Sequence, residues 1–217
     1  MVIRKFPPVA QADQYGLLAI GGDLEVESLL LAYQSGIFPW PFSDEYPAWF
    51  APERRAVLFF ENFKISKSMQ KERRRNKFVF RHNTEFESVI RACASETNRK
   101  KQRGTWINED VIQAYLNFHK AGYAHSIECF KDEKLVGGLY GVAIGAMFAG
   151  ESMFYREPNA SKLALWHTVE TLKAKGITWI DCQVQSKFLE SLGVTEVARE
   201  EFTRMAEEAV STDLRLF

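Results

Sequence analysis

Apolar residues recur every three or four positions in two stretches near the middle of the chain. The first stretch holds Phe86, Val89 and Ile90, and the second holds Val111, Ile112, Tyr115 and Phe118. This spacing puts them on one face of a helix, so helices are predicted over residues 84–94 and 108–121, the second capped by Asn108. A helix is also predicted over residues 159–175, and a short basic helix, capped by Ser66, over residues 66–75.

Segments rich in β-branched and aromatic residues lie among these helices and predict strands. They cover residues 78–81, 125–130, 135–143, 146–154 and 179–183. The polar run at residues 131–134 and the pair Ile144 and Gly145 are expected to turn the chain between the three central strands. Two helices, antiparallel strands, a helix and a strand follow one another as in the N-acetyltransferase-like (GNAT-type) acyltransferase fold. An α+β catalytic domain is therefore predicted over residues 60–217.

The first 59 residues have a different pattern and are predicted to form a small N-terminal domain. Gly21-Gly22-Asp23 indicates a turn into a helix that Ser35 and Gly36 end. Prolines then alternate with aromatic residues over residues 37–52 and are expected to prevent regular structure there. The aromatic rings would therefore lie on rigid loops, where they either fasten this unit to the larger domain or offer a stacking surface for nucleobases.

The composition shows that the chain can form a real core, since 46% of its 217 residues are hydrophobic and 26% are charged. No apolar run approaches the roughly 18 residues of a membrane span. The first residues also lack the apolar core of a signal peptide, so a cytoplasmic protein is expected. The three cysteines, Cys93, Cys129 and Cys182, have neither the spacing of a zinc site nor that of a disulfide framework, and are expected to be buried thiols.

Charge is balanced over the whole chain but not along it. Lys and Arg number 28, as do Asp and Glu, yet residues 1–108 carry a net charge of +5 and residues 109–217 one of −5. The basic excess concentrates in residues 61–104, whose net charge is +8. Such a density attracts phosphates by releasing counterions, so the balanced total does not exclude a nucleic acid partner.

Polar side chains interrupt strands that are otherwise apolar. Asp181 and Gln183 are expected on one face of the last predicted strand, because side chains alternate along a strand. Glu151, His125 and Glu128 interrupt two of the central strands. These groups could surround one cleft of the sheet, or Asp181 and Gln183 could instead satisfy a loop backbone.

Residues 100–107 join a basic run to Trp106. This combination is expected where phosphates approach a protein and a base stacks on it. A solvated charged face accounts for the same residues, so both interpretations stay open here.

Eight short stretches form a pattern that covers nearly the whole chain, from about residue 6 to residue 202. They are GLLAIGGDL (16–24), AYQSGIFPW (32–40), GTWI (104–107), HSIE (125–128), LVGGLYGV (135–142), GESMF (150–154), NASK (159–162) and DCQV (181–184). In sequence and in order they resemble the leucyl/phenylalanyl-tRNA–protein transferases of bacteria. The chain departs from that pattern at Phe188, where a His is usual, and in a longer basic segment at residues 96–103.

The resemblance implies a transferase that moves Leu or Phe, and less readily Met, from aminoacyl-tRNA to the N-terminal Arg or Lys of an acceptor protein. The acceptor is thereby marked for degradation through the N-degron (N-end rule) pathway. A small N-terminal domain on a GNAT-type domain, a cytoplasmic location and the absence of any cofactor, metal or membrane partner are implied as well.

The resemblance also implies roles for individual residues. Asp181 and Gln183 match the family's proposed catalytic pair, with Glu151 beside them. The substrate-binding residues are Trp40 and Trp106 for the terminal adenosine, and Leu139, Phe148 and Ile180 for the amino-acid pocket. The tRNA-binding residues lie in the basic helix: Lys67, Lys71, Arg73, Arg74, Arg75 and Lys77.

Transfer requires an α-amine to attack an ester, a downhill reaction that needs positioning more than a strong base, since an N-terminal amine titrates near ~8. Gln183 is expected to accept a hydrogen bond from the amine, and Asp181 to hold and polarise the Gln183 amide. The ribose hydroxyls of the donor could relay the proton.

Two other functions fit part of the sequence. An acyl-coenzyme-A-dependent acyltransferase would share the fold, but residues 155–162 lack the Gly-rich loop that holds the pyrophosphate of that donor. A non-catalytic tRNA-binding module would explain the basic segment and leave Asp181 and Glu151 without a purpose.

Overall fold

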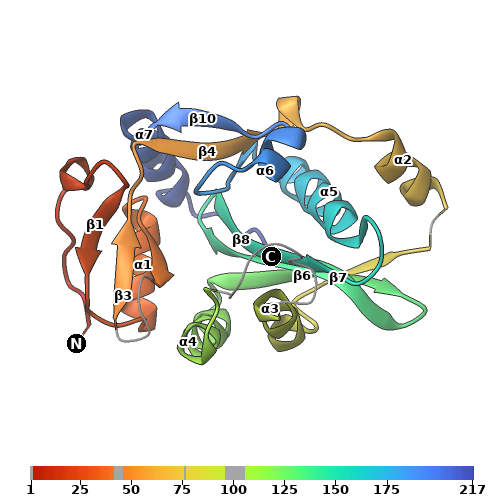
Figure 1. Ribbon diagram of the computed structural model, residues 1–217, viewed down its shortest axis with the longest axis horizontal. Coiled ribbons are helices and arrows are strands. Elements are labelled where there is room, and N and C mark those ends of the chain that lie inside the picture. The colour runs from red at the N-terminus through yellow and green to blue at the C-terminus, as the bar shows by residue number, and fades with distance from the viewer. Residues whose placement is uncertain (1, 42–45, 76, 96–105) are drawn as a thin grey trace.

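The computed structural model describes residues 2–41, 46–75, 77–95 and 106–217. Within these residues the strands form a three-stranded and a seven-stranded sheet (Figure 1). The small sheet has the order β1-β3-β2 and comprises β1 (Leu17–Ile20), β2 (Phe38–Pro41) and β3 (Pro47–Phe50). The large sheet has the order β10-β4-β9-β8-β7-β6-β5. Its strands are β4 (Arg54–Phe59), β5 (Val79–His82), β6 (Ala124–Lys131), β7 (Lys134–Ile144), β8 (Met147–Tyr155), β9 (Trp179–Asp181) and β10 (Thr195–Ala198).

The helices that the sequence predicts are confirmed in type and closely in extent. They are α1 (Val26–Gln34), α2 (Lys67–Arg74), α3 (Phe86–Ala94), α4 (Glu109–Lys120) and α5 (Ala160–Ala174). The predicted caps are present too, since Ser66 Oγ accepts from Met69 N and Asn108 Oδ1 accepts from Val111 N. The chain also forms α6 (Lys187–Ser191), α7 (Arg199–Val210) and the 3₁₀ turns η1 (Val9–Gln11) and η2 (Phe60–Asn62).

The two faces of the large sheet are covered by different helices (Figure 1). Along β7 the side chains alternate, so that Tyr140 and Val142 join one core with residues of α3 and α4. Leu139 and Ala143 join a second core on the opposite face, together with residues of α5. The result is a sheet packed between α3 and α4 on one side and α5 on the other.

The large sheet changes from antiparallel to parallel between β8 and β9. These two strands pair at Ala149 and Asp181, whereas the strands on either side of them pair antiparallel. β8 continues beyond that pair through residues 150–155, which still pair with β7. On the side of β9 these residues line a cavity. The end of the β8–β9 pairing therefore opens the sheet.

The prediction that prolines prevent regular structure over residues 37–52 is wrong. β2 and β3 form a hairpin in which Pro39 pairs with Trp49 and Pro41 with Pro47. β2 lies at the edge of its sheet, where a missing backbone N–H costs no ladder bond, and Pro47 is the first residue of β3.

β4 and β10 are two strands that the sequence pattern did not predict. They pair with each other, and β4 also pairs with β9, so β4 lies inside the large sheet. The division of the chain at residue 59 stays a prediction, although residues 54–59 share the sheet of the larger unit. Within the described residues no helix has both the length and the apolar character needed to cross a membrane.

Candidate active site

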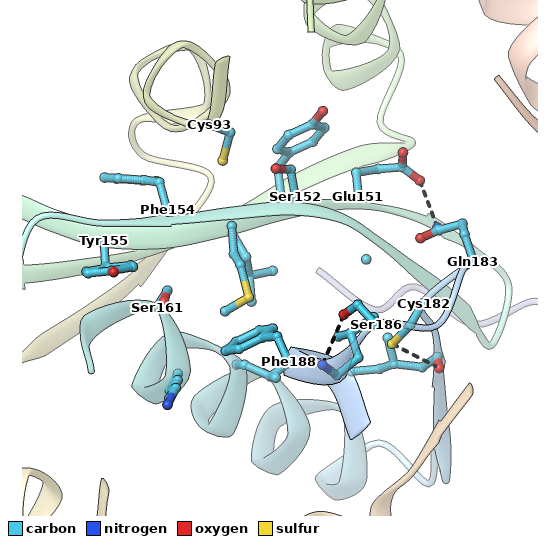
Figure 2. Close-up of a pocket in the computed structure, with 18 of the residues that line it drawn as sticks. Cys93, Glu151, Ser152, Phe154, Tyr155, Ser161, Cys182, Gln183, Ser186 and Phe188 are labelled. Atoms are coloured by element: carbon cyan, nitrogen blue, oxygen red, sulfur yellow. Dashed lines mark hydrogen bonds between the residues drawn. The ribbon is translucent and has the colours of Figure 1, made fainter. Parts of the chain in front are cut away.

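A cavity of about 1160 Å³ lies beside β8 (Figure 2). Elements far apart in the sequence contribute to its lining, among them β2, α3, α5 and α6. Of the residues singled out from the sequence, the cavity is lined by Trp40, Trp106, Leu139, Phe148, Glu151, Ile180 and Gln183. Asp181 is 1% exposed and does not belong to the lining.

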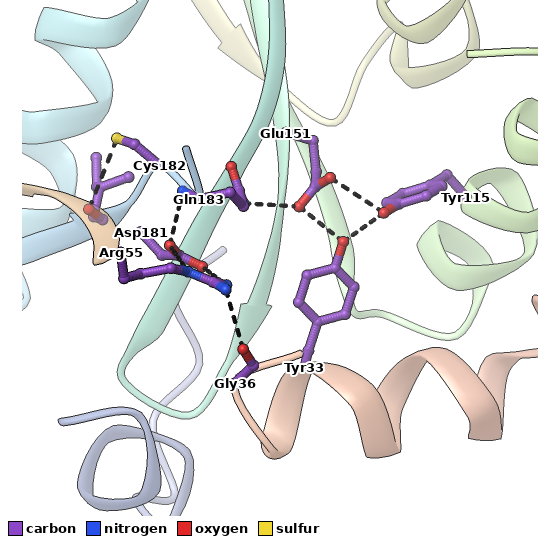
Figure 3. Close-up of polar contacts among 9 residues, drawn as sticks. Tyr33, Gly36, Arg55, Tyr115, Glu151, Asp181, Cys182 and Gln183 are labelled. Atoms are coloured by element: carbon purple, nitrogen blue, oxygen red, sulfur yellow. Dashed lines mark hydrogen bonds and ion pairs between the residues drawn. The ribbon is translucent and has the colours of Figure 1, made fainter. Parts of the chain in front are cut away.

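Glu151, on β8, accepts hydrogen bonds from three side chains (Figure 3). The Tyr33 hydroxyl lies 2.8 Å from Oε1, the Gln183 amide nitrogen lies 3.2 Å from the same oxygen, and the Tyr115 hydroxyl lies 3.2 Å from Oε2. The two tyrosine hydroxyls also share a hydrogen bond. Because Tyr33 belongs to α1 and Tyr115 to α4, two helices hold this carboxylate in place.

Burial raises the pKa of Glu151 to about 7, and the negative charge of Asp181 adds to the effect, while the hydrogen bond from Tyr33 opposes it. Burial also raises the pKa of Tyr33 and of Tyr115 well above the usual value, so both hydroxyls stay protonated. Tyr33, Tyr115 and Glu151 make three oxygen–oxygen contacts with one another, and each contact needs one proton. The two hydroxyls supply two of these protons, and a protonated Glu151 supplies the third. Glu151 is therefore a group that gains and loses a proton near neutral pH.

Gln183 lies outside the strand that was predicted to contain it. β9 ends at Asp181, and Gln183 has a left-handed backbone with a φ of 55°. That conformation is uncommon for a residue other than Gly, Asn or Asp, and such residues concentrate at functional sites. A turn, and not a shared strand face, thus brings Gln183 to Glu151.

Asp181 is bound to a residue that the sequence analysis missed. Arg55 Nε lies 2.8 Å from Oδ1 of Asp181 and Arg55 Nη2 lies 2.7 Å from Oδ2, and both side chains are buried. Asp181 Oδ1 also accepts from the backbone N–H of Gln183 at 3.0 Å. The expectation that Asp181 holds the Gln183 amide is therefore wrong, since Asp181 holds the backbone of Gln183 and Glu151 holds its amide.

The guanidinium of Arg55 is itself enclosed by the protein. It lies between the rings of Phe38 and Phe202, at 4.5 and 4.3 Å from their centroids, and donates to the Gly36 carbonyl. In the sequence Arg55 stands as one of two adjacent arginines after a Pro- and aromatic-rich segment, and nothing there distinguishes it from a surface residue. Its partner, 126 residues further along, could not be identified from the sequence alone.

Trp40 and Trp106 stack on each other at the edge of the cavity, with ring centroids 5.8 Å apart and planes 27° apart. Trp40 is 39% exposed, which is unusual for so large an apolar ring. Of the basic run that precedes Trp106, residues 96–105 lie outside the described part of the chain. The stacked pair of rings lines the same cavity as Glu151 and Gln183.

The cavity also has an apolar wall. Leu139, Phe148 and Ile180 are each at most 4% exposed and line it together with Met153 and Leu165. Phe188 lines the same cavity with 40% of its surface exposed, and the centre of its ring lies 5.7 Å from Lys162 Nζ. The cavity thus combines a buried apolar wall with a more open rim.

The basic helix α2 presents most of its charges to solvent. Lys67, Lys71, Arg74, Arg75 and the nearby Lys77 are exposed. Arg73 differs from them, because it pairs with Glu170 of α5 and lies over the ring of Trp166 at 5.0 Å. Arg73 therefore fastens α2 to α5.

Other polar groups singled out from the sequence lie elsewhere. Glu128 accepts from Ser126, Thr84 and the backbone of Glu85, and His125 contacts Asn83, so neither lines the cavity. Cys93 and Cys129 are buried as expected, whereas Cys182 is partly exposed. Among the described residues there is no cluster of three or more His, Cys, Asp or Glu side chains that could hold a metal ion.

The strand order, the parallel junction of β8 and β9 and the cavity at their separation define an acyltransferase domain of the N-acetyltransferase type, as predicted. The family model described as leucyl/phenylalanyl-tRNA protein transferase matches residues 57–207, and the model of that family's N-terminal domain matches residues 22–53. The chain belongs to the leucyl/phenylalanyl-tRNA–protein transferase family.

Two relatives share about half of their residues with this chain, and both are named leucyl/phenylalanyl-tRNA–protein transferase. The protein of Pseudoalteromonas atlantica is 49% identical over 94% of this chain and 88% of its own length. That of Flavobacterium johnsoniae is 50% identical over 91% of this chain and 92% of its own length. Among solved structures, a GCN5-related N-acetyltransferase from Kribbella flavida is similar with a TM-score of 0.39 and 10% identity over 75% of this chain and 57% of that one.

Proposed function

We propose that the protein transfers Leu or Phe, and less readily Met, from aminoacyl-tRNA to the N-terminal Arg or Lys of acceptor proteins. The name of its relatives supports the donor class, and the cavity beside β8 supports an acyl transfer. Because aminoacyl-tRNA is a cytoplasmic molecule, the cytoplasm is the proposed compartment. Degradation of the acceptor through the N-degron pathway is the proposed outcome.

One arrangement carries this proposal: the cavity joins a carboxylate–amide pair, an apolar wall and a stacked pair of tryptophans. The aminoacylated end of a tRNA likewise has three parts, which are the ester, the amino-acid side chain and the terminal adenosine. We assign the ester to Glu151 and Gln183, and the adenosine to Trp40 and Trp106. The Leu or Phe side chain then contacts the apolar wall, where burial favours large aliphatic and aromatic groups.

In the proposed reaction the acceptor amine attacks the ester carbonyl, so that a C–N bond forms while the C–O bond to the ribose breaks. Gln183 donates its amide N–H to Glu151, which leaves its amide oxygen to accept from the amine and to direct the lone pair. Glu151, with a pKa of about 7, takes the proton that the amine must lose. A proton is returned to the ribose oxygen as the tRNA leaves.

Asp181 and Arg55 are positioning residues in this scheme. Asp181 fixes the backbone of Gln183, and Arg55 fixes Asp181 with two hydrogen bonds. The pair keeps Gln183 in its left-handed turn, without which the amide would not reach Glu151. A displacement of a reacting or positioning group by about 1 Å is enough to lower the rate ~10²-fold.

The preference for a basic acceptor is proposed to rest on Glu151. The charge of Asp181 is compensated by Arg55, so it offers little attraction to a substrate. A charge-assisted hydrogen bond between Glu151 and a cationic residue contributes about 1.5–3 kcal/mol, which corresponds to at least tenfold discrimination. The exposed charges of α2 are the proposed contact for tRNA phosphates.

Incubating the purified protein with labelled Leu-tRNA and matched peptides that begin with Arg, Lys, Ala or Asp tests the proposal. Labelled Leu should appear on the Arg and Lys peptides only. Binding of the tRNA without transfer to any peptide would contradict the assignment. Leu-coenzyme A, supplied in place of the tRNA, should give no product.

A further inference from the structure

The end of the described chain packs against the back of the cavity wall. After α7 the chain passes the turn between β7 and β8, where Ala146 N donates to the Ala209 carbonyl. It then runs to α5, where Lys175 Nζ donates to the Arg215 carbonyl, and Leu216 is buried in the same core as α5. The last residue, Phe217, packs against that same core, on the α5 face of the large sheet. Figure 1 marks this end of the chain beside the sheet.

The Phe217 ring contacts the rings of three residues from three strands of that sheet. Its ring centroid lies 5.6 Å from that of Phe148 on β8, 5.1 Å from that of His125 on β6 and 5.5 Å from that of His82 on β5. Phe148 lines the cavity and Phe217 does not, so Phe217 contacts a residue of the cavity wall without lining the cavity itself.

The backbone of β7 restricts the Phe148 ring on one side. On β7, a Cβ at Gly141 would lie 2.5 Å from Cζ of Phe148, so the Phe148 ring rests directly on the Gly141 backbone and cannot move in that direction. Burial lowers the pKa of His82, and lowers that of His125 to about 4, so both rings that pack against Phe217 are uncharged at neutral pH.

We infer that Phe217 is a positioning residue that sets the depth of the donor pocket by holding Phe148 against the cavity. The inference rests on the proposed function, in which Phe148 forms part of the wall for the donor side chain. Removing the Phe217 ring leaves a cavity into which Phe148 can tilt, because side chains around a large-to-small substitution relax partly into the space that it leaves. The pocket would then deepen and favour the larger donor.

Phe217→Ala tests the inference through the ratio of kcat/KM for Leu-tRNA to kcat/KM for Phe-tRNA. A difference of one methylene between substrate and pocket changes discrimination between two substrates roughly tenfold. The ratio of the Leu-tRNA value to the Phe-tRNA value should therefore fall by about 5- to 10-fold. Phe217→Leu keeps most of the volume and should restore the ratio to within about twofold of the parent. A general loss of stability would instead lower both values equally.

Two further variants make each outcome decisive. Leu172→Ala removes a buried side chain from the same core that does not line the cavity, and it should leave the ratio unchanged. The inference would be overturned if the ratio changed as much in Leu172→Ala as in Phe217→Ala, or if it stayed unchanged in Phe217→Ala. Phe148→Ala should itself shift the ratio, so a null result in both Phe148→Ala and Phe217→Ala would mean that the proposed donor pocket is wrong.

Discussion

Arg55 and Asp181 lie 126 residues apart in sequence and form a buried ion pair through two hydrogen bonds, of 2.8 and 2.7 Å. The pair joins β4 to the end of β9, directly before the turn that holds Gln183 (Figure 3). Asp181 does not line the cavity, so in the proposed mechanism the pair acts through the backbone of Gln183.

Breaking this pair should impair both folding and transfer. Arg55→Ala or Asp181→Ala leaves one buried charge without its partner, and we expect the free energy of unfolding to fall by about 3–5 kcal/mol. Urea denaturation measures that loss directly. An unfolding free energy within about 1 kcal/mol of the parent would show that the remaining charge reaches water.

The double variant Arg55→Met with Asp181→Leu separates stability from positioning. An apolar pair of similar volume often restores the stability of a buried ion pair, so unfolding should recover most of the loss. Transfer should stay low, because a leucine side chain cannot accept the hydrogen bond that the Gln183 backbone donates to Asp181. Recovery of both stability and transfer would show that the pair has a purely structural role.

Gln183→Ala should lose transfer while it keeps tRNA binding. In the proposed mechanism the amide positions the acceptor amine, and it lies on a different element from α2. We therefore expect kcat to fall on the order of 10²-fold or more, with the KM for aminoacyl-tRNA nearly unchanged. Gln185→Ala, two residues further along, is the matched control, because the Gln185 amide donates to the Val194 carbonyl and does not line the cavity. Near-normal turnover of Gln183→Ala would remove this residue from the mechanism.

Much of the fold could be predicted because its signals are local. The helix caps Ser66 and Asn108 lie next to the helices that they start, and the three central strands are separated by short turns. β4 and β10 offered no such signal. The inner residues of β4 are buried without alternation, and the four residues of β10 become a strand by pairing with β4, more than 130 positions earlier.

The site was predicted as a set of residues but not as a geometry. Glu151 and Gln183 were expected near each other on strands, whereas a left-handed turn at Gln183 makes their hydrogen bond. Tyr33 and Tyr115 gave no sign of their role, since Tyr115 fits the apolar face of α4 and Tyr33 is buried in α1. Contacts between such distant residues depend on packing, which a single sequence does not display.

Transfer should depend on pH through Glu151. Since burial raises its pKa to about 7, the base form appears as pH rises through that value, and kcat should rise with it. In Glu151→Gln this limb should disappear, leaving the titration of the acceptor amine near ~8. A parent profile that is flat between about pH 6 and about 7.5 would contradict the role of Glu151 as a base.

Stability should show the opposite trend. A carboxyl with a raised pKa binds its proton more tightly in the folded state than in the unfolded one, where it titrates near ~4.3. The contribution of Glu151 to stability is therefore full below about pH 4 and is lost as pH rises towards about 7. Glu151→Gln should remove this decline in the unfolding free energy, which chemical denaturation at several pH values measures.

The basic helix α2 provides the last prediction, because its arginines have different surroundings. Arg74 is exposed, whereas Arg73 is bound to Glu170 and lies over Trp166. Each phosphate contact contributes ~0.7–0.9 to the slope of log K against log salt concentration. Arg74→Ala should therefore flatten the salt dependence of tRNA binding by about that amount.

Arg73→Ala should leave the slope unchanged and cost about 1–2 kcal/mol of stability through the lost ion pair and cation–π contact. A filter-binding series at several salt concentrations distinguishes the two, and a flatter slope for Arg73→Ala alone would mean that tRNA draws this side chain away from α5.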